Sequence, residues 1–259
     1  MNILHGTNWL GLYTLTRKEI ARFMKVHVQT VSAPVLTAVL YYLVFAVALG
    51  DNLKTMAGVP FLAFLAPGLI MMTMMQNAFN NSSSSLVIAK IQGHMTDFLL
   101  PPLSHGEFLT GFMAGGVARA VVVGVASAVT LWLLLDLSVA HMWAVVVYGL
   151  LGSMLLSVVG VLCGIWAEKF DQVAAVQNFF IVPGTFLSGT FYTADQLPPH
   201  WQFICHLNPF FYMIDGFRYG FIGVSDGTLM TGFVYLLVLN VAMLGLAYYW
   251  LHTGYRLRG

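Results

Sequence analysis

The residues of this sequence that could do chemistry are few and scattered. Arg119 lies inside a long apolar stretch, and Asp215 and Arg218 are three residues apart after Pro209, a spacing that lets them pair on one helical face. Gly223 to Gly227 matches GxSxG, but it lacks the preceding strand and the hydrolase domain that give the motif meaning, so we interpret it as a chance turn. The eight histidines form no HExxH motif. The sequence therefore predicts no catalytic residue and no metal site.

The chain also lacks the loop that binds ATP phosphates in many ATPases. It contains no GxxxxGKS/T motif, and none of its 25 glycines is followed by lysine. We therefore expect no cofactor on this chain, and any transport that it performs must draw energy from elsewhere.

Composition predicts an integral membrane protein. Hydrophobic residues make up 59% of the chain and charged residues only 8%, whereas soluble domains carry about 25% charged residues. The net charge of +1 and the absence of a basic run argue against nucleic acid as a partner, which leaves the lipid bilayer as the expected surroundings.

Hydropathy predicts an all-α polytopic fold with six transmembrane helices. We place them at about 30–50, 60–82, 108–135, 142–167, 173–192 and 229–252, each long enough for a hydrocarbon core of ~30 Å. Only Lys54 and Arg218 fall in segments on one side of these spans, and most other Lys and Arg residues fall on the other: Arg17, Lys18, Arg22, Lys25, Lys90, Lys169, Arg256 and Arg258. The positive-inside rule then puts both termini in the cytoplasm.

Residues 8–25 are predicted to form a helix that lies on the membrane surface. One face carries an apolar repeat at helical spacing, and basic residues project from the opposite side. The apolar face consists of Trp9, Tyr13, Thr16, Ile20 and Phe23, and the basic side of Lys18, Arg22 and Lys25.

The cytoplasmic segment 89–107 is a polar-bearing interruption that breaks at Gly93 and at Pro101-Pro102. A short helix from His94 to Leu100 would nevertheless show apolar residues on one face. We interpret it as a docking surface for another protein, made of His94, Met95, Asp97, Phe98, Leu99 and Leu100. The alternative is a capped connector whose leucines lie on the membrane interface.

Two spans carry the same polar pattern in opposite order. Pro67-Gly68 precedes Gln76-Asn77 in the second span, and Gln177-Asn178 precedes Pro183-Gly184 in the fifth. Because these spans cross in opposite directions, the two amide pairs match in depth and could wall a common cavity. The predicted translocation path consists of Gln76, Asn77, Asn80, Gln177, Asn178 and Arg119. The alternative is that the amides only join helices and that Arg119 bonds to carbonyls or to these amides.

The outer segment 193–226 is apolar but too short to cross. Pro198-Pro199 and Asn208-Pro209 divide it into two short helical pieces, which predicts a re-entrant hairpin. We expect it to act as a plug at the outer end of the path, with Asn208, Pro209, Tyr212, Asp215 and Arg218 as its principal residues.

Three segments resemble the ABC-2 type transporter permeases, most closely their YadH-type branch. They are FLAPGLIMMTMMQNAFNN (64–81), HLNPFFYMIDGFRYGFIG (206–223), and the basic surface helix followed by APVLTAVLYYLVF (33–45). The resemblance covers nearly the whole chain in order. Its most specific part is the pattern of Asn208, Pro209, Tyr212, Phe217 and Arg218.

The resemblance implies a single domain, residues 1–259, that forms the membrane subunit of an exporter in the bacterial inner membrane. It implies a homodimer that docks two copies of a separate ABC ATP-binding protein, which would use ATP and Mg²⁺. The family's coupling helix would fall on His94 to Leu100, and spans two and five would line the path. Related permeases carry more charged residues in that helix than this chain does between Gly93 and Asp97. This difference bears on which ATP-binding protein docks there, and less on the docking itself.

The mostly apolar path favours a lipid-like or amphipathic substrate. The alternative function is a membrane-embedded lipid-modifying enzyme, which would need two ionisable groups converging at one depth. A purely structural membrane anchor is a third reading, and the depth-matched amides argue against it.

Overall fold

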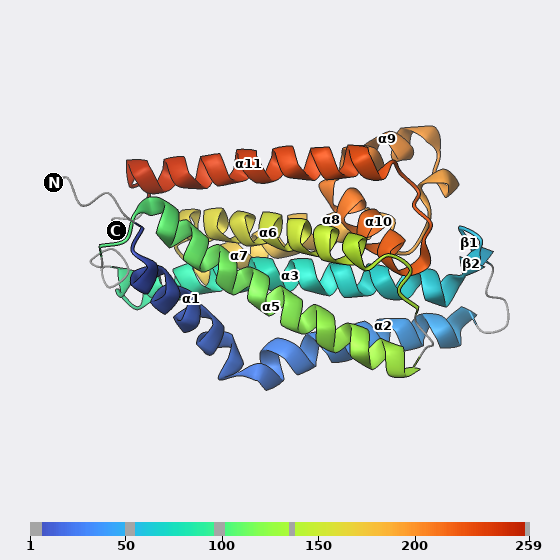
Figure 1. The fold of residues 1–259 in the computed structure, drawn as a ribbon, viewed down its shortest axis with the longest axis horizontal. Helices are drawn as coiled ribbons and strands as arrows, with labels where there is room; N and C mark the ends of the chain where they lie inside the picture. Colours follow the sequence, from blue (N-terminus) through green and yellow to red (C-terminus); the bar gives the residue numbers. More distant parts are fainter. Residues whose placement is uncertain (1–6, 50–54, 96–101, 135–137, 257–259) are drawn as a thin grey trace.

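The computed structural model describes residues 7–49, 55–95, 102–134 and 138–256. Within these ranges the chain is helical apart from one two-stranded hairpin, and the long helices lie side by side along one axis (Figure 1). The long helices are α1 (Trp9–Met24), α2 (Ala33–Leu49), α3 (Phe61–Ile91), α5 (His105–Leu134), α6 (Met142–Trp166) and α11 (Leu229–Thr253). The shorter elements are η1 (Val28–Ser32), β1 (Thr55–Met56), β2 (Val59–Pro60), α7 (Phe170–Val176), η3 (Gln177–Ile181), α8 (Val182–Phe186), η4 (Ala194–Gln196), α9 (Pro199–Leu207) and α10 (Pro209–Ile222).

Five helices are long and apolar enough to cross a membrane. They are Val28–Ala48, which combines η1 with most of α2, and α3, α5, α6 and α11. The predicted stretch 173–192 differs from them, because α7, η3 and α8 form a shorter helical run that ends at Phe186 and is followed by turns and bends. The protein is thus a polytopic, all-α membrane protein with five candidate spans in its described residues.

Helix α3 is the central element of the bundle. It lies mainly against α5 and α6, and its apolar stretch is the most deeply buried of the five. The Pro67-Gly68 pair does not interrupt the helix, because α3 runs through both residues. Pro67 lies in the second turn, where its missing N–H removes a single backbone hydrogen bond. The helix also continues past the predicted end at residue 82 to Ile91.

Glycines allow the helices to approach closely. A Cβ atom on Gly160 of α6 would lie 2.5 Å from the backbone oxygen of Phe79, and one on Gly164 would lie 2.8 Å from Cβ of Leu86. Both distances are shorter than real Cβ atoms tolerate, so α3 can pack against this face of α6 only because the two side chains are absent.

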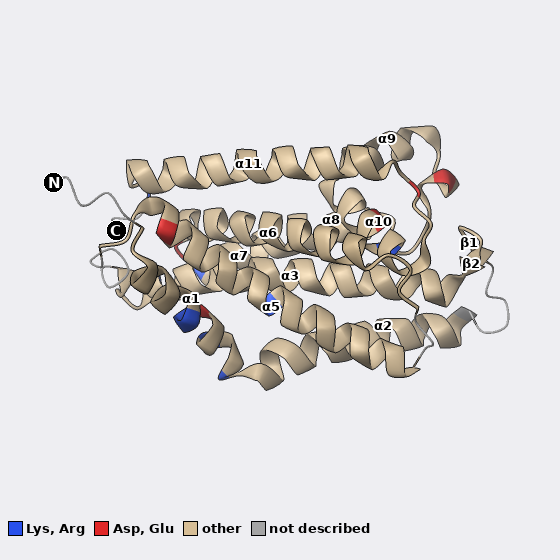
Figure 2. Ribbon diagram, in the orientation of Figure 1, with Lys and Arg blue, Asp and Glu red and all other residues tan. Residues whose placement is uncertain are grey.

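The ends of several helices meet at the end of the molecule that carries both described chain termini (Figure 1). Lys90 of α3 donates to the carbonyl oxygens of Ile165 and Ala167, and Arg256 donates to that of Trp166 at 3.0 Å. These cations satisfy carbonyl groups at the C-terminal end of α6, where the helix dipole also favours positive charge. Figure 2 shows most Lys and Arg residues in this half of the molecule.

The opposite end carries the β-hairpin and the short helices α8, α9 and α10, which we call the outer helices after their predicted location. Ala57 and Gly58 connect β1 to β2 with φ of 50° and 79°, which are the two positive values that a tight hairpin turn requires. The N–H groups of Ala140 and His141, before α6, donate to the carbonyls of Phe221 and Gly220 in α10. The predicted division of segment 193–226 into two short helical pieces is confirmed by α9 and α10.

Candidate functional site

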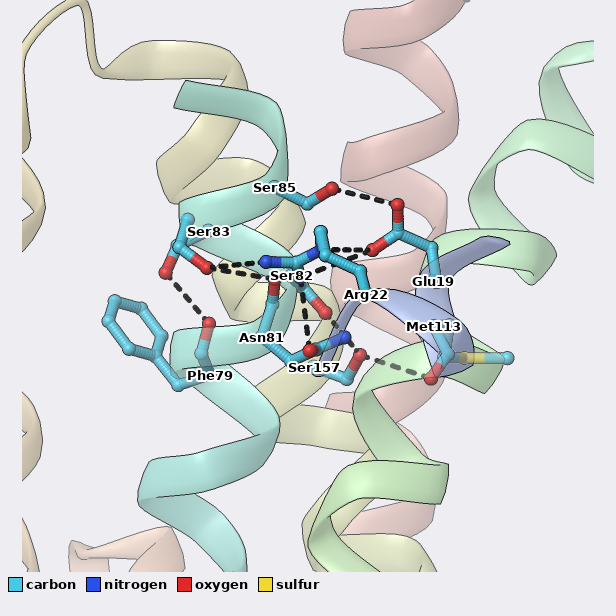
Figure 3. Close-up of polar contacts among 10 residues, drawn as sticks. Glu19, Arg22, Phe79, Asn81, Ser82, Ser83, Ser85, Met113 and Ser157 are labelled. Atoms are coloured by element: carbon cyan, nitrogen blue, oxygen red, sulfur yellow. Dashed lines mark hydrogen bonds and ion pairs between the residues drawn. The ribbon is translucent and has the colours of Figure 1, made fainter. Parts of the chain in front are cut away.

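A line of polar residues follows one face of α3 and receives charged side chains from α1 (Figure 3). Asn81 accepts from Nη2 of Arg22 through its backbone oxygen at 2.7 Å and through Oδ1 at 3.0 Å. Ser85 donates its hydroxyl to Oε1 of Glu19 at 2.8 Å. Asn81 and Ser85 therefore form a hydrogen-bonded contact between α3 and α1.

Glu19 is the fully buried charge of this contact. Its Oε2 lies 3.2 Å from Nη2 of Arg22, and its side chain is 0% exposed, against 28% for Arg22. A buried carboxylate is tolerated only when it is paired and hydrogen-bonded, and here it has both kinds of partner.

The arrangement corrects the predicted faces of the surface helix. Trp9 and Tyr13 are exposed, as the surface-helix hypothesis requires, but Phe23 is buried against the bundle. Arg22 turns inward to Asn81 instead of projecting away. The apolar repeat is therefore divided between two environments, because one face of α1, with Leu15, Glu19 and Phe23, packs into the bundle.

A second polar contact joins α3, α5 and α6. The hydroxyl groups of Ser82 and Ser157 are 2.7 Å apart, and Ser157 donates to the backbone oxygen of Met113 at 3.2 Å. A Cβ atom on Gly116 of α5 would lie 2.3 Å from Oγ of Ser157, so the glycine makes room for this pair.

Arg119 of α5 lies against Asn77 of α3. Its Nε and Nη2 both donate to Oδ1 of Asn77, at 3.1 and 2.8 Å. Asn77 in turn donates Nδ2 to the backbone oxygen of Thr73 at 2.9 Å, which fixes the amide. The alternative to a path is that Arg119 bonds to one of the span amides, and this contact is of that kind. It also brings together two of the residues predicted to line the path.

The other predicted path residues lie apart from this contact. Gln76 and Asn80 are half-buried on α3. Gln177 and Asn178 begin the π-helical turn η3, where Gln177 is half-buried and Asn178 exposed. No hydrogen bond between described residues joins the two amide pairs. The depth match between them stays a prediction.

Both Pro-Gly pairs border the outer helices. A Cβ atom on Gly68 would lie 3.4 Å from Nη2 of Arg218. The carbonyl oxygen of Gly184 accepts from Nδ2 of Asn208 at 2.8 Å. The two dipeptides thus lie at the same end of the molecule, beside α10.

Asn208 and Pro209 form the junction between α9 and α10. Oδ1 of Asn208 accepts from the N–H of Phe210 at 3.1 Å and caps α10, and Pro209 occupies the first turn, where its missing N–H is harmless. Tyr212 lies one turn later, with its ring centroid 5.2 Å from that of Tyr235 in α11. These residues hold the hairpin against the last span.

The predicted pairing of Asp215 with Arg218 is wrong. In the described residues, Arg218 forms its ion pair with Asp226 at 3.9 Å, and it also donates to the carbonyl of Gly189 at 2.6 Å. Asp215 accepts from the N–H groups of Asp226 and Gly227 at 2.8 and 3.0 Å. Burial raises the pKa of the Asp226 carboxyl, and the charge of Arg218 opposes that rise.

The predicted docking segment lies mostly outside the described residues. Asp97, Phe98, Leu99 and Leu100 fall in the range 96–101. Of the remaining two, His94 is exposed and Met95 is buried. Gly93 has a φ of 72°, a left-handed value just after the end of α3, in agreement with the predicted break at this glycine.

Glu107 connects this region to α1. Its Oε1 accepts from the N–H of Asn8 at 2.6 Å, and its Oε2 from the N–H of Ser104 at 2.7 Å. Asn8 also donates Nδ2 to the carbonyl of Pro102 at 3.3 Å. One carboxylate therefore satisfies the beginnings of both α1 and α5.

Two cavities lie away from the predicted path. One, of about 350 Å³, borders α9 and is lined by Leu187, Tyr192, Leu197, Pro198, Trp201, Ile204 and Cys205. The other, of about 270 Å³, is lined almost wholly by apolar residues of α5, α6 and α10, together with Met74. Neither cavity is lined by a residue that we predicted to line the path.

Sequence reasoning missed Glu19, Ser157 and Asp226. A signal for Glu19 was present, because it is the single acidic residue of a basic helix and precedes Arg22 by three residues. Ser157 and Asp226 have no local signal, since their partners lie on helices and loops distant in the sequence.

Comparison with known proteins identifies the family. Residues 11–222 match the ABC-2 type transporter family. The chain is 40% identical over 235 residues to the inner membrane transport permease YadH of Escherichia coli (strain K12), covering 90% of this chain and 91% of that protein. It is 27% identical over 233 residues to nodulation protein J of Neorhizobium galegae, covering 87% and 86% of the two chains. These relationships support a role as an inner-membrane transport permease. The chain belongs to the ABC-2 type transporter family.

Proposed function

We propose that this chain is the membrane subunit of an ATP-driven exporter and that it docks a separate ABC ATP-binding protein. Its family membership, combined with the absence of a phosphate-binding loop from the sequence, is the observation that carries this proposal. The partner would bind ATP and Mg²⁺. The docking surface would be His94 to Leu100, directly after the end of α3 at Ile91.

We propose six crossings, with α7, η3 and α8 as a short fifth span. An even number of spans puts both termini on one side, in agreement with the described chain ends at one end of the bundle (Figure 1). The concentration of Lys and Arg at that end supports a cytoplasmic orientation. Exposed Trp9 and Tyr13 suit a position of α1 at the membrane interface.

A homodimer with two ATP-binding subunits completes the proposal. The short fifth span carries large apolar side chains that the single chain leaves uncovered, with Phe179 76% and Phe180 70% exposed. Covering this face with a second copy would place Gln177 and Asn178 at the dimer interface. We propose that the path for a lipid-like or amphipathic substrate runs there, with Gln76 and Asn80 on its wall and the α9–α10 hairpin closing its outer end.

Copurification from the native host tests the docking proposal. Mild-detergent extraction of the tagged chain should recover an ATPase with a phosphate-binding loop in roughly equal amount. The double substitution Phe98→Asp and Leu99→Asp should abolish that recovery while membrane insertion is retained, because two carboxylates would be forced into an apolar contact.

The matched control is Val139→Asp with Met142→Asp, which adds the same charge at exposed positions beyond the other end of α5. Recovery of the ATPase with the control variant but not with the docking variant supports the proposal. Equal recovery with both variants contradicts the assignment of the docking segment.

A further inference from the structure

Three polar residues of α3, at positions 77, 81 and 85, repeat every four residues and therefore share one face. Each contacts a different charged side chain. Asn77 accepts from Arg119, Asn81 accepts from Arg22, and Ser85 donates to Glu19. The charges of α1 and α5 thus meet along a single line on the central helix.

The charges along this line do not balance. The line carries two guanidinium groups and one carboxylate, and that carboxylate, Glu19, is bound to Arg22 at 3.2 Å and to Ser85 at 2.8 Å. Among the described residues, no carboxylate lies within ion-pair distance of Arg119. The surplus positive charge of the line therefore resides on Arg119.

The guanidinium of Arg119 is oriented with one nitrogen free. Nε and Nη2 both donate to a single oxygen, Oδ1 of Asn77, and Nδ2 of Asn77 is fixed to the carbonyl of Thr73. Nη1 donates to none of the described residues and is not among the fully enclosed unpartnered atoms, so it keeps some exposure on a half-buried side chain. Asn77 holds the other two donors and is therefore a positioning residue for this guanidinium.

The surroundings of Arg119 suit an amphipathic molecule. The next turns of α5 expose Val122, Val125 and Val129, which form an apolar stripe beside the half-buried arginine. A cation at the head of an apolar stripe matches an anionic head group attached to a hydrocarbon tail. Guanidinium groups bind phosphate oxygens especially well, because their planar donors fit that geometry.

We propose that Arg119 binds the phosphate group of an anionic amphiphile, with the tail along Val122, Val125 and Val129. This site deepens the proposed function, because it gives the lipid-like substrate or a bound lipid a phosphate head group. The role of the site in transport rests on that proposed function. The phosphate could belong to a membrane lipid or to a molecule that enters from water. The two sources share the same contact with Arg119.

Binding of dodecyl phosphate to the purified full chain tests this site. Titration followed by native mass spectrometry should show saturable binding that Arg119→Gln and Asn77→Asp each weaken at least tenfold. Asn77→Asp keeps the shape of the contact but supplies an internal carboxylate for Arg119, so it removes the surplus charge without removing the arginine. Arg119→Lys should keep part of the affinity, and Arg17→Gln, at an exposed cation of α1, should leave it unchanged.

Competition distinguishes the two sources. Displacement of dodecyl phosphate by phosphatidylglycerol but not by millimolar inorganic phosphate assigns the site to a lipid head group, and displacement by both assigns it to phosphate in general. Affinities of Arg119→Gln and Asn77→Asp within twofold of the unmodified chain would overturn the proposal. Because the titration uses this chain alone, its failure leaves the docking of an ATPase untouched, and failure of the copurification leaves the phosphate site standing.

Discussion

Gly115 of α5 and Glu19 of α1 are in such close contact that a Cβ atom on Gly115 would lie 2.5 Å from Cβ of Glu19. One turn earlier, a Cβ atom on Gly111 would lie 2.6 Å from Cδ2 of Leu15. The GxxxG pair of α5 therefore receives two successive buried side chains of α1. This close approach brings the Glu19 carboxylate within reach of Ser85 on α3.

Gly115→Val should displace α1 from the bundle and lower the thermal stability of the purified protein. Overpacking of a close contact costs about 1–3 kcal/mol, and here the added atoms meet a buried charged residue. Thermal unfolding in detergent is the measurement. Gly245→Ala is the control, since its added Cβ has no heavy atom within 4 Å and should be neutral or slightly stabilising.

Glu19→Ala should destabilise the protein by about 1–3 kcal/mol, because it leaves the hydroxyl of Ser85 without its acceptor and the guanidinium of Arg22 without its carboxylate partner. Glu19→Gln keeps an oxygen for Ser85 and should have a smaller effect. Glu168→Gln provides the comparison, since its 4.0 Å contact with Arg256 is exposed and should contribute little. If Glu19→Ala lowers the unfolding midpoint no more than Glu168→Gln does, the contact of Glu19 with Ser85 and Arg22 does not stabilise the protein as described.

Arg218→Met should loosen the outer end of the molecule. The guanidinium is buried, lies 3.6 Å from the ring centroid of Phe64 and bonds to Gly189, so its removal leaves that carbonyl and Asp226 unpaired. Cys205 of α9 is 2% exposed and serves as a native reporter. Maleimide labelling of Cys205 in a Cys163→Ala background should accelerate severalfold in the Arg218→Met variant, and an unchanged rate would show that this cluster does not hold the hairpin.

Asn77→Leu and Gln177→Leu should each alter transport or substrate-stimulated ATPase activity, if both residues line the path. The two variants should differ in stability, because the side chain of Asn77 binds Arg119 whereas the side chain of Gln177 forms no hydrogen bond to a described residue. We expect a lower unfolding midpoint for Asn77→Leu alone. Wild-type activity in both variants, measured after reconstitution with the ATPase partner, would identify the amides as packing groups only.

Sequence patterns predicted the long helices well where the length of the apolar stretch alone sets the ends of the helix. The expected spans 142–167 and 229–252 differ from α6 and α11 by one residue at a single end. The pattern failed at Ser82 to Ser85, because a polar run was taken as the end of a span. Those serines are satisfied inside the protein, as when Ser83 donates to the carbonyl of Phe79, so α3 continues through them.

The candidate site was harder to predict, because its contacts join residues far apart in the chain. The arginine and the amide of the Arg119–Asn77 contact were each recognised as unusual within apolar spans. Glu19 was not, since a carboxylate in a basic surface helix reads as solvated until the glycine face of α5 is known to cover it. Asp226 likewise reaches Arg218 only through the turn after α10, which no periodicity predicts.

The two carboxylate oxygens of Glu107 join the start of α1 to the start of α5. Because Oε1 holds the start of α1 and Oε2 holds the residue just before α5, a pull on the chain between α3 and α5 is delivered to both helices at their first turn. The first turns of α1 and α5 are therefore coupled through one side chain, and a displacement of this loop would reach the two helices together.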